Sequence, residues 1–183
     1  MKTIQIVGNG TSRLSLTNKI NDLTNTFKYP IYACNLGYEN LNYTKLFVID
    51  DKMKTIISDR KIQYEKISVD MEYEPYVVNS NRPRNNTGMV AMQFAIDIGY
   101  TRLICYGFDF IIQEKQQKLS NIFDGQIGYE EQTRCSYDDT FGRIRYLEYM
   151  LKNNQNILFQ FVFDKKYQIE ETLLQYKNFN VTD

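Results

Sequence analysis

Short apolar runs, separated by helical and polar segments, constrain the fold of this chain more than any other sequence feature. Most of the runs are apolar at nearly every position, which is typical of strands covered on both faces. They lie at 3–7, 31–34, 45–49, 66–69, 76–79, 103–106 and 157–163. Helical patterns fall between them, at 12–23, 54–59, 87–100, 138–152 and 170–177. This alternation predicts an α/β fold with a mostly parallel sheet and helices on both faces.

Length and charge narrow the classes of protein to which the chain can belong. A chain of 183 residues suffices for one domain, 1–183, whose core needs no disulfide or metal support. The 22 basic and 22 acidic residues cancel, so we expect no nucleic-acid partner. We also expect no transmembrane segment, because the longest apolar runs are too short to span a bilayer. Cys34 and Cys105 fall inside predicted strands, which indicates buried thiols and a cytoplasmic, reducing location.

The sequence contains no histidine. This absence removes the commonest general base at neutral pH and the commonest ligand of transition metals. The three cysteines are scattered and are the only soft donors that remain. We therefore expect no metal site.

Small or short polar residues follow four of the predicted strands. In parallel sheets, ligands bind beyond the carboxyl ends of the strands, near the point where the strand order reverses. The sequence therefore predicts a binding site at this edge. Asp109 could serve there as a helix cap or as the acceptor of a sugar hydroxyl. The residues at these strand ends are Gly8, Asn9, Gly10, Asn35, Asp50, Gly107 and Asp109.

The glycine pair after the first strand has two interpretations. Gly8 and Gly10 would allow a sharp turn and a close approach of the backbone to a ligand. Thr11 and Ser12 could then cap the next helix or donate hydrogen bonds to an anion. The dinucleotide fingerprint is excluded, because Arg13 stands where its third glycine belongs. The other interpretation is a tight turn between strand and helix.

A second candidate site lies at the start of the apolar helix expected at 87–100. Asn86 or Thr87 can act as the N-cap, and Gly99 stands where a C-terminal cap belongs. The free N–H groups of this helix start suit a phosphate. The preceding Arg82 and Arg84 could contact that phosphate or belong to a solvated linker. The candidate residues here are Arg84, Asn86, Thr87 and Gly88.

The segment 111–137 has no clear periodicity. From Gln113 to Cys135 it is polar and irregular, which predicts a mobile loop or a small lid over the site.

Three stretches, IVGNGTS, ACN and NTGMVAMQFAIDIGYTRLICYGFDF, resemble the bacterial lipooligosaccharide sialyltransferases of glycosyltransferase family 42. The resemblance covers 1–35 and 84–110, and more faintly 139–152. It implies a single Rossmann-like domain that transfers sialic acid from a CMP-activated sugar without a metal or another cofactor. The implied partners are this nucleotide sugar, a glycan acceptor and further copies of the chain in a homo-oligomer.

The same resemblance implies roles for individual residues. Gly8 and Asn9 would line the CMP site, and Asn35 would contact the nucleotide. Asn86 and Thr87 would hold the nucleotide or the donor sugar. Arg84 would correspond to an arginine of the active site.

The chain departs from the family mainly in the catalytic half of the site. The histidine that serves as the family's base corresponds to a position near Cys135, whose thiol could replace it only with a lowered pKa. The nearby carboxylates that could act as the base instead, or could cap a helix and lie in a solvated loop, are Glu130, Glu131, Asp138 and Asp139. Of two family tyrosines that steady the leaving phosphate, the first corresponds to Ile111. The second is lost or replaced by Tyr129.

Three functions therefore remain open. The first is a sialyltransferase-like enzyme with a changed base. The second is a nucleotide or nucleotide-sugar binding protein without transfer activity. The third is a scaffold in which the glycines only turn the chain.

Overall fold

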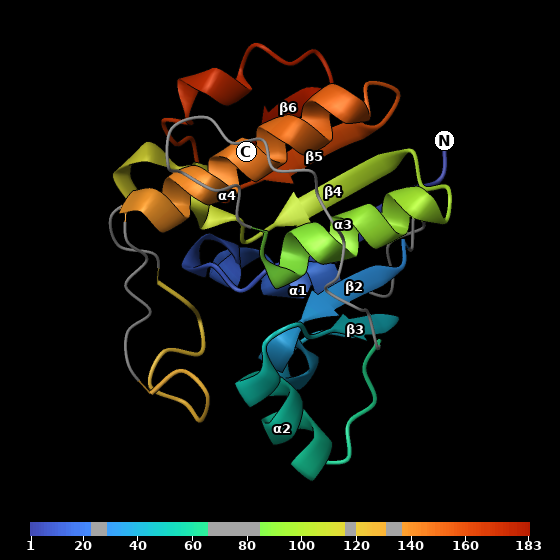
Figure 1. Cartoon of the computed structure of the whole chain (residues 1–183), viewed down its shortest axis with the longest axis vertical. Coiled ribbons are helices and arrows are strands. Elements are labelled where there is room, and N and C mark those ends of the chain that lie inside the picture. Colours follow the sequence, from blue (N-terminus) through green and yellow to red (C-terminus); the bar gives the residue numbers. More distant parts are fainter. Residues whose placement is uncertain (23–28, 66–84, 116–119, 131–136) are drawn as a thin grey trace.

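The computed structural model describes residues 1–22, 29–65, 85–115, 120–130 and 137–183. These residues form a six-stranded sheet, all parallel, with the strand order β3-β2-β1-β4-β5-β6 (Figure 1). This is the Rossmann-like order. The expected fold class is confirmed. The strands are β1 (Thr3–Val7), β2 (Ile31–Cys34), β3 (Lys45–Phe47), β4 (Arg102–Tyr106), β5 (Leu158–Val162) and β6 (Phe179–Thr182).

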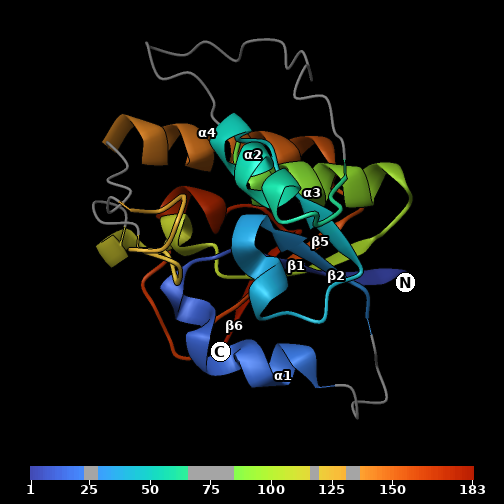
Figure 2. The same ribbon diagram turned by 90° about the horizontal axis from the view of Figure 1, so that it is seen from below.

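Helices cover both faces of the sheet. Figure 2 shows α1 on the side opposite to α3 and α4. The α-helices are α1 (Thr17–Asn21), α2 (Asp51–Asp59), α3 (Thr87–Asp97) and α4 (Tyr137–Asn153). Five short 3₁₀ helices complete the described elements: η1 (Thr11–Leu16), η2 (Asn35–Glu39), η3 (Asp109–Ile111), η4 (Gln113–Lys115) and η5 (Glu171–Leu173).

The alternation of side chains along the strands divides the core into two clusters. In β4, Leu103 and Cys105 point toward the α3–α4 side, whereas Ile104 and Tyr106 belong to the cluster on the α1 side. The α3–α4 cluster contains most of the large buried aromatic rings, including Phe161. The buried, free thiols of Cys34 and Cys105 agree with the expectation from sequence.

One expected helix forms only in part, and another is wrong. The pattern at 12–23 forms η1 and the short α1, because Arg13 folds inward onto the carbonyl of Gly8 instead of pointing to solvent. The helix expected at 170–177 is only the turn η5, and the chain then enters β6, which was not predicted. Phe179 of β6 packs its ring 5.2 Å from that of Phe161, and this tertiary contact outweighs the helical propensity of the preceding residues.

The other expected helices and strands either differ from the structure only at their ends or lie outside the described residues. The apolar helix ends at Asp97, and Gly99 has a φ of 89°, as its capping role requires. Strand ends shift by one or two residues, and α2 begins three residues before the expected start. The strands expected at 66–69 and 76–79 lie outside the described residues.

Candidate functional site

A cavity of about 330 Å³ lies at the carboxyl edge of the sheet. It is bordered by the turns that follow β1, β2, β3 and β4. β1 and β4 are neighbours, although the chain passes through β2 and β3 between them, so the strand order reverses here. Ligands of open parallel sheets bind at this point. The volume falls at the lower end of small-molecule sites, about 300–1,000 Å³.

The fold brings most of the predicted binding residues to this cavity. Thr11 and Ser12 are the exceptions, since they lie behind it in η1. The residues that line it are Gly8, Asn9 and Gly10 after β1, Asn35 after β2, Asp50 after β3, Asn86, Thr87 and Gly88 at the start of α3, and Gly107 and Asp109 after β4.

The glycines allow two turns to touch. The N–H of Gly8 donates to Tyr106 O at 2.9 Å, and that of Gly10 donates to Gly107 O at 3.0 Å. A Cβ on Gly8 would lie 2.7 Å from Gly107 O. A Cβ on Gly107, whose φ is +68°, would lie 2.7 Å from Gly8 O. Backbone atoms therefore leave no room for a side chain at either glycine, as the tight-turn interpretation requires. The same turns form the floor of the cavity.

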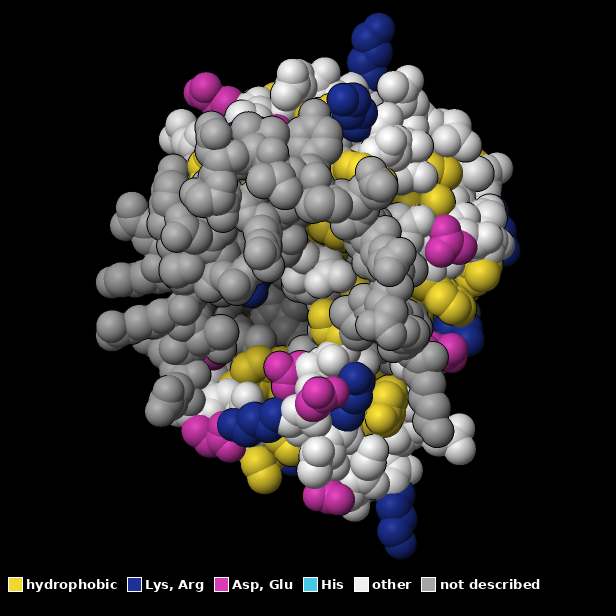
Figure 3. All heavy atoms as spheres, in the orientation of Figure 1, with side chains coloured by type: hydrophobic (Ala, Val, Ile, Leu, Met, Phe, Trp, Pro, Cys, Tyr) yellow, Lys and Arg dark blue, Asp and Glu magenta, His cyan; other side chains and the backbone are white. Residues whose placement is uncertain are grey.

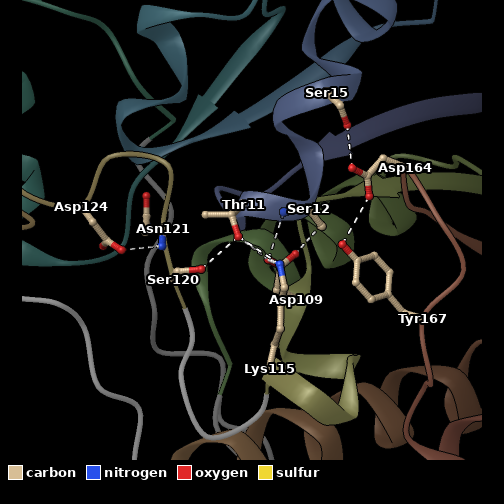
Figure 4. Close-up of polar contacts among 10 residues, drawn as sticks. All are labelled: Thr11, Ser12, Ser15, Asp109, Lys115, Ser120, Asn121, Asp124, Asp164 and Tyr167. Atoms are coloured by element: carbon tan, nitrogen blue, oxygen red, sulfur yellow. Dashed lines mark hydrogen bonds and ion pairs between the residues drawn. The ribbon is translucent and has the colours of Figure 1, made fainter.

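Asp109 caps the first turn of η1 from another part of the chain. Its buried carboxylate accepts hydrogen bonds from Ser12 N at 3.1 Å, from Ser12 Oγ and from Thr11 Oγ1 at 3.3 Å. Lys115 Nζ donates to it at 3.2 Å (Figure 4). The donors that the sequence suggested for an anion at η1 are thus occupied by this carboxylate. Of the two roles expected for Asp109, the structure shows the cap.

The start of α3 also lines the cavity. Asn86 is the N-cap, and its Oδ1 accepts from Met89 N at 2.9 Å. Thr87 and Gly88 line the cavity at the helix end where N–H groups lack intrahelical partners. A Cβ on Gly88 would lie 2.5 Å from the ring of Phe108, so only glycine lets the helix start this close to the turn after β4.

Carboxamides and a tyrosine join the turns after β1 and β2. Asn9 Nδ2 donates to Cys34 O at 2.9 Å. Asn35, which has a φ of 51°, donates from Nδ2 to the hydroxyl of Tyr129 at 2.8 Å and accepts from Thr87 Oγ1 at 3.4 Å. Burial raises the pKa of Tyr129, against the opposing effect of its asparagine hydrogen bonds. Its phenol therefore stays protonated at neutral pH.

The described part of the expected lid forms one wall of the cavity. The N–H of Ile122 donates to Asn9 O at 2.9 Å, and the ring of Phe123 stacks on that of Tyr129, with centroids 6.4 Å apart. On its other side the segment 120–130 contacts α2 through an ion pair between Lys52 and Glu130, at 2.9 Å. A backbone hydrogen bond at Gly128, together with Lys52, lowers the pKa of Glu130 to about 2.

Charges of both signs lie on α2, which contacts this wall. Figure 3 shows Lys, Arg, Asp and Glu side chains interspersed over α2, at the lower end of the view. No single-sign patch forms over that helix. Among the described residues that line the cavity, the cationic one is Arg143 of α4, and the anionic ones are Asp50 and Asp109.

Sequence reasoning missed several lining residues. Arg143 lies in the middle of an amphipathic helix pattern, and no local signal distinguishes it from other surface arginines. Ser120 and Asn121 belong to the irregular segment, where the pattern fixes no position. Tyr129 was expected only through the family resemblance. The other unpredicted lining residues are Cys34, Ile49, Asn85, Phe108 and Phe110.

The structure describes no side chain of the expected catalytic residues. Arg84 and Cys135 lie outside the described residues, and Asp138 and Asp139 belong to the first turn of α4, where the description omits side chains. The lining carboxylate of Asp50 caps α2, since its Oδ1 accepts from Met53 N at 3.1 Å. Both aspartates described at the cavity, Asp50 and Asp109, are therefore engaged in capping.

Two kinds of feature are absent from the described portion of the chain. It contains no group of three or more His, Cys, Asp or Glu residues placed to hold a metal ion. None of its helices combines the length and the apolar character needed to cross a membrane. Comparisons with protein-family models, curated proteins and solved structures found no match to this chain.

Proposed function

We propose that this chain binds a CMP-activated sugar in the cavity and is a glycosyltransferase-like protein related to sialyltransferases. The observation that supports the proposal best is the meeting of two anion-binding features in one cavity. Thr87 and Gly88 bring the positive end of α3 to it, and α4 brings the guanidinium of Arg143. Each suits a phosphate, and the position at the strand reversal suits a nucleotide.

The rest of the lining can recognise the uncharged parts of such a ligand. Asn85 carries an amide group that both donates and accepts, as the edge of a base and the hydroxyls of a sugar require. Phe108 and Phe110 add apolar surface. A few polar groups set in apolar surface are the usual composition of a small-molecule site.

Transfer of the sugar needs a base as well as a binding site. The acceptor hydroxyl attacks the anomeric carbon of the donor, its proton passes to the base, and CMP leaves with the bonding electron pair on its phosphate. Asp138 or Asp139 is the proposed base, and Arg84 is the proposed active-site cation. The acceptor is a glycan, the location is cytoplasmic, and a homo-oligomer is the proposed assembly.

A nucleotide-sugar binding protein without transfer activity is the second candidate. It is favoured by the capping roles of Asp50 and Asp109, because neither described carboxylate at the cavity is available to accept a proton. Hydrolysis or transfer from CMP-sialic acid, lost in Asp138→Asn or Asp139→Asn, would support the enzyme. Binding of CMP without turnover in the unaltered chain would support the binding protein.

The first experiment is a thermal-shift titration with CMP, with UMP, GMP, AMP and NAD as controls. A ligand at a hundred times its dissociation constant adds about 2.7 kcal/mol to the free energy of unfolding. We expect a CMP-selective rise that Arg143→Gln reduces. Arg145→Gln is the matched control, because Arg145 pairs with Glu148 on the same helix and does not line the cavity. Equal shifts with all nucleotides, or none, would refute the proposal.

Gly10→Val is a poor test of the same site. A Cβ on Gly10 would lie 2.8 Å from Gly107 O and would also contact the carboxylate of Asp109. Loss of binding in that variant would report a displaced turn rather than a lost ligand contact.

A further inference from the structure

Arg13 is a fully buried cation directly behind the cavity floor. Its Nε donates to Gly8 O at 2.7 Å, and one Nη donates to Asn9 Oδ1 at 3.3 Å. Both acceptors belong to residues that line the cavity. Its other partners are Thr17 Oγ1, at 3.3 Å, and Asn40 Oδ1, at 3.1 Å. One layer of neutral groups thus separates this charge from the cavity.

The protein provides Arg13 with hydrogen bonds but with no counter-charge among the described residues. All four partners are neutral oxygens, and no described carboxylate lies at ion-pair distance from the guanidinium. Burial lowers the pKa of Arg13 to about 10 and raises that of the neighbouring Cys34 to about 12. At neutral pH the arginine is therefore charged and the thiol is neutral. A buried charge without an opposite charge is costly.

We propose that Arg13 is a buried counter-charge that selects a ligand with an anionic group over the Gly8–Asn9 turn. This inference deepens the proposed function and rests on the same cavity. It assigns recognition of the anion to a residue that the ligand does not touch.

The physical argument is one of position and screening. Charges interact more strongly where water is excluded, and Arg13 has no exposed surface through which solvent could screen it. The carboxylate of Asp109, which also borders the cavity, is already offset by Lys115. An anion over Gly8 and Asn9 would offset the cost of burying Arg13, so folding and binding are coupled through this residue.

Asn40→Asp tests the proposal without removing Arg13. The change is nearly isosteric and sets a carboxylate beside the guanidinium, where Asn40 Oδ1 now lies 3.1 Å away. It supplies the missing counter-charge from within the protein. Asn42→Asp is the matched control, since it adds the same charge at an exposed position two residues further along.

The readouts are the unfolding temperature and the dissociation constants of CMP, of the uncharged nucleoside cytidine and of pyrophosphate. We expect Asn40→Asp to raise the unfolding temperature and to weaken CMP and pyrophosphate about tenfold, with cytidine changed less than about twofold. Asn42→Asp should change neither the unfolding temperature nor the affinities. A purely structural Arg13 would leave the CMP-to-cytidine ratio unaltered, and that result would overturn the proposal.

The probes separate this inference from the proposed function. If pyrophosphate stabilises the unaltered protein more than Asn40→Asp while CMP alone stabilises the unaltered protein no more than UMP, GMP or AMP does, the counter-charge holds and the nucleotide proposal fails. If CMP binds selectively and equally well to both proteins, the nucleotide proposal holds and the counter-charge fails. If no anion binds the unaltered protein more tightly than Asn40→Asp, the counter-charge also fails.

Discussion

Asp109→Asn tests whether the cap on η1 holds the site together. The substitution keeps the volume of the side chain, so it opens no cavity. It removes the negative charge and turns an NH₂ group toward donors, which include Ser12 N at 3.1 Å and Lys115 Nζ at 3.2 Å. The variant therefore opposes donor to donor at a side chain that is only 1% exposed.

The expected loss can be estimated from the contacts. Hydrogen bonds to a charged group contribute about 1.5–3 kcal/mol each, and the two bonds from Ser12 are the closest. The bonds from Thr11 and Lys115 are longer, and the 26% exposure of Lys115 lets water solvate its ammonium after the change. Asn retains one acceptor oxygen. We therefore expect a decrease of about 2–3 kcal/mol in the free energy of unfolding, or about 2–4 °C in melting temperature per kcal/mol.

Urea titration followed by circular dichroism measures this loss. Asp164→Asn is the matched control, because Asp164 accepts from Ser15 Oγ at 2.8 Å and from the hydroxyl of Tyr167 at 3.3 Å but is exposed (Figure 4). It should cost less than about 0.5 kcal/mol. Equal effects of the two substitutions would refute the reasoning, since burial is the difference between them.

Three further predictions concern packing and ionisation. Gly8→Ala should lower the free energy of unfolding by about 2 kcal/mol or more, because its Cβ would meet Gly107 O at 2.7 Å. Gly99→Ala, which has open space but a φ of +89°, should lower it by about 1 kcal/mol. Urea titration of both variants measures the difference. Phe161→Ala should cost about 3–5 kcal/mol by the same assay, since its ring is fully buried, and a loss below about 1 kcal/mol would contradict the packing. Burial raises the pKa of the Cys34 thiol from 9.0 to about 12, so above pH 9 this thiol ionises only in the unfolded chain, and the free energy of unfolding should fall by about 1.4 kcal/mol per pH unit. Cys34→Ala should lack this contribution. Stability profiles of the two proteins that run parallel between pH 9 and 11 would contradict the prediction.

The half of the site built from strand ends could be predicted from sequence. Parallel strands place their carboxyl ends at one edge, so identifying the strand that ends at Val7 and the one that ends at Cys34 already places Gly8 near Asn35. Local signals were also sufficient for the start of α3, where an N-cap residue precedes an apolar run. Both inferences depend on patterns that extend over only a few residues.

The other half depends on contacts that no local pattern encodes. Arg143 reaches the cavity because α4 packs across the sheet, and Tyr129 does so because the segment 120–130 is held between Asn9 and α2. β6 was missed for a related reason. Four residues with Phe179 and Val181 on one face give a weak strand signal, and pairing with β5 supplies the stabilisation.

Arg13 illustrates how one residue can mislead sequence reasoning and still reveal chemistry. Its position after Gly10 excluded the dinucleotide fingerprint, and an arginine in a polar helical pattern indicates an exposed side chain. The structure buries it instead and surrounds it with neutral oxygens. Such a charge lowers stability unless something offsets its cost. An anionic ligand at the strand reversal, one layer away, would do so, which makes the buried cation an argument for the class of ligand that is independent of the glycines.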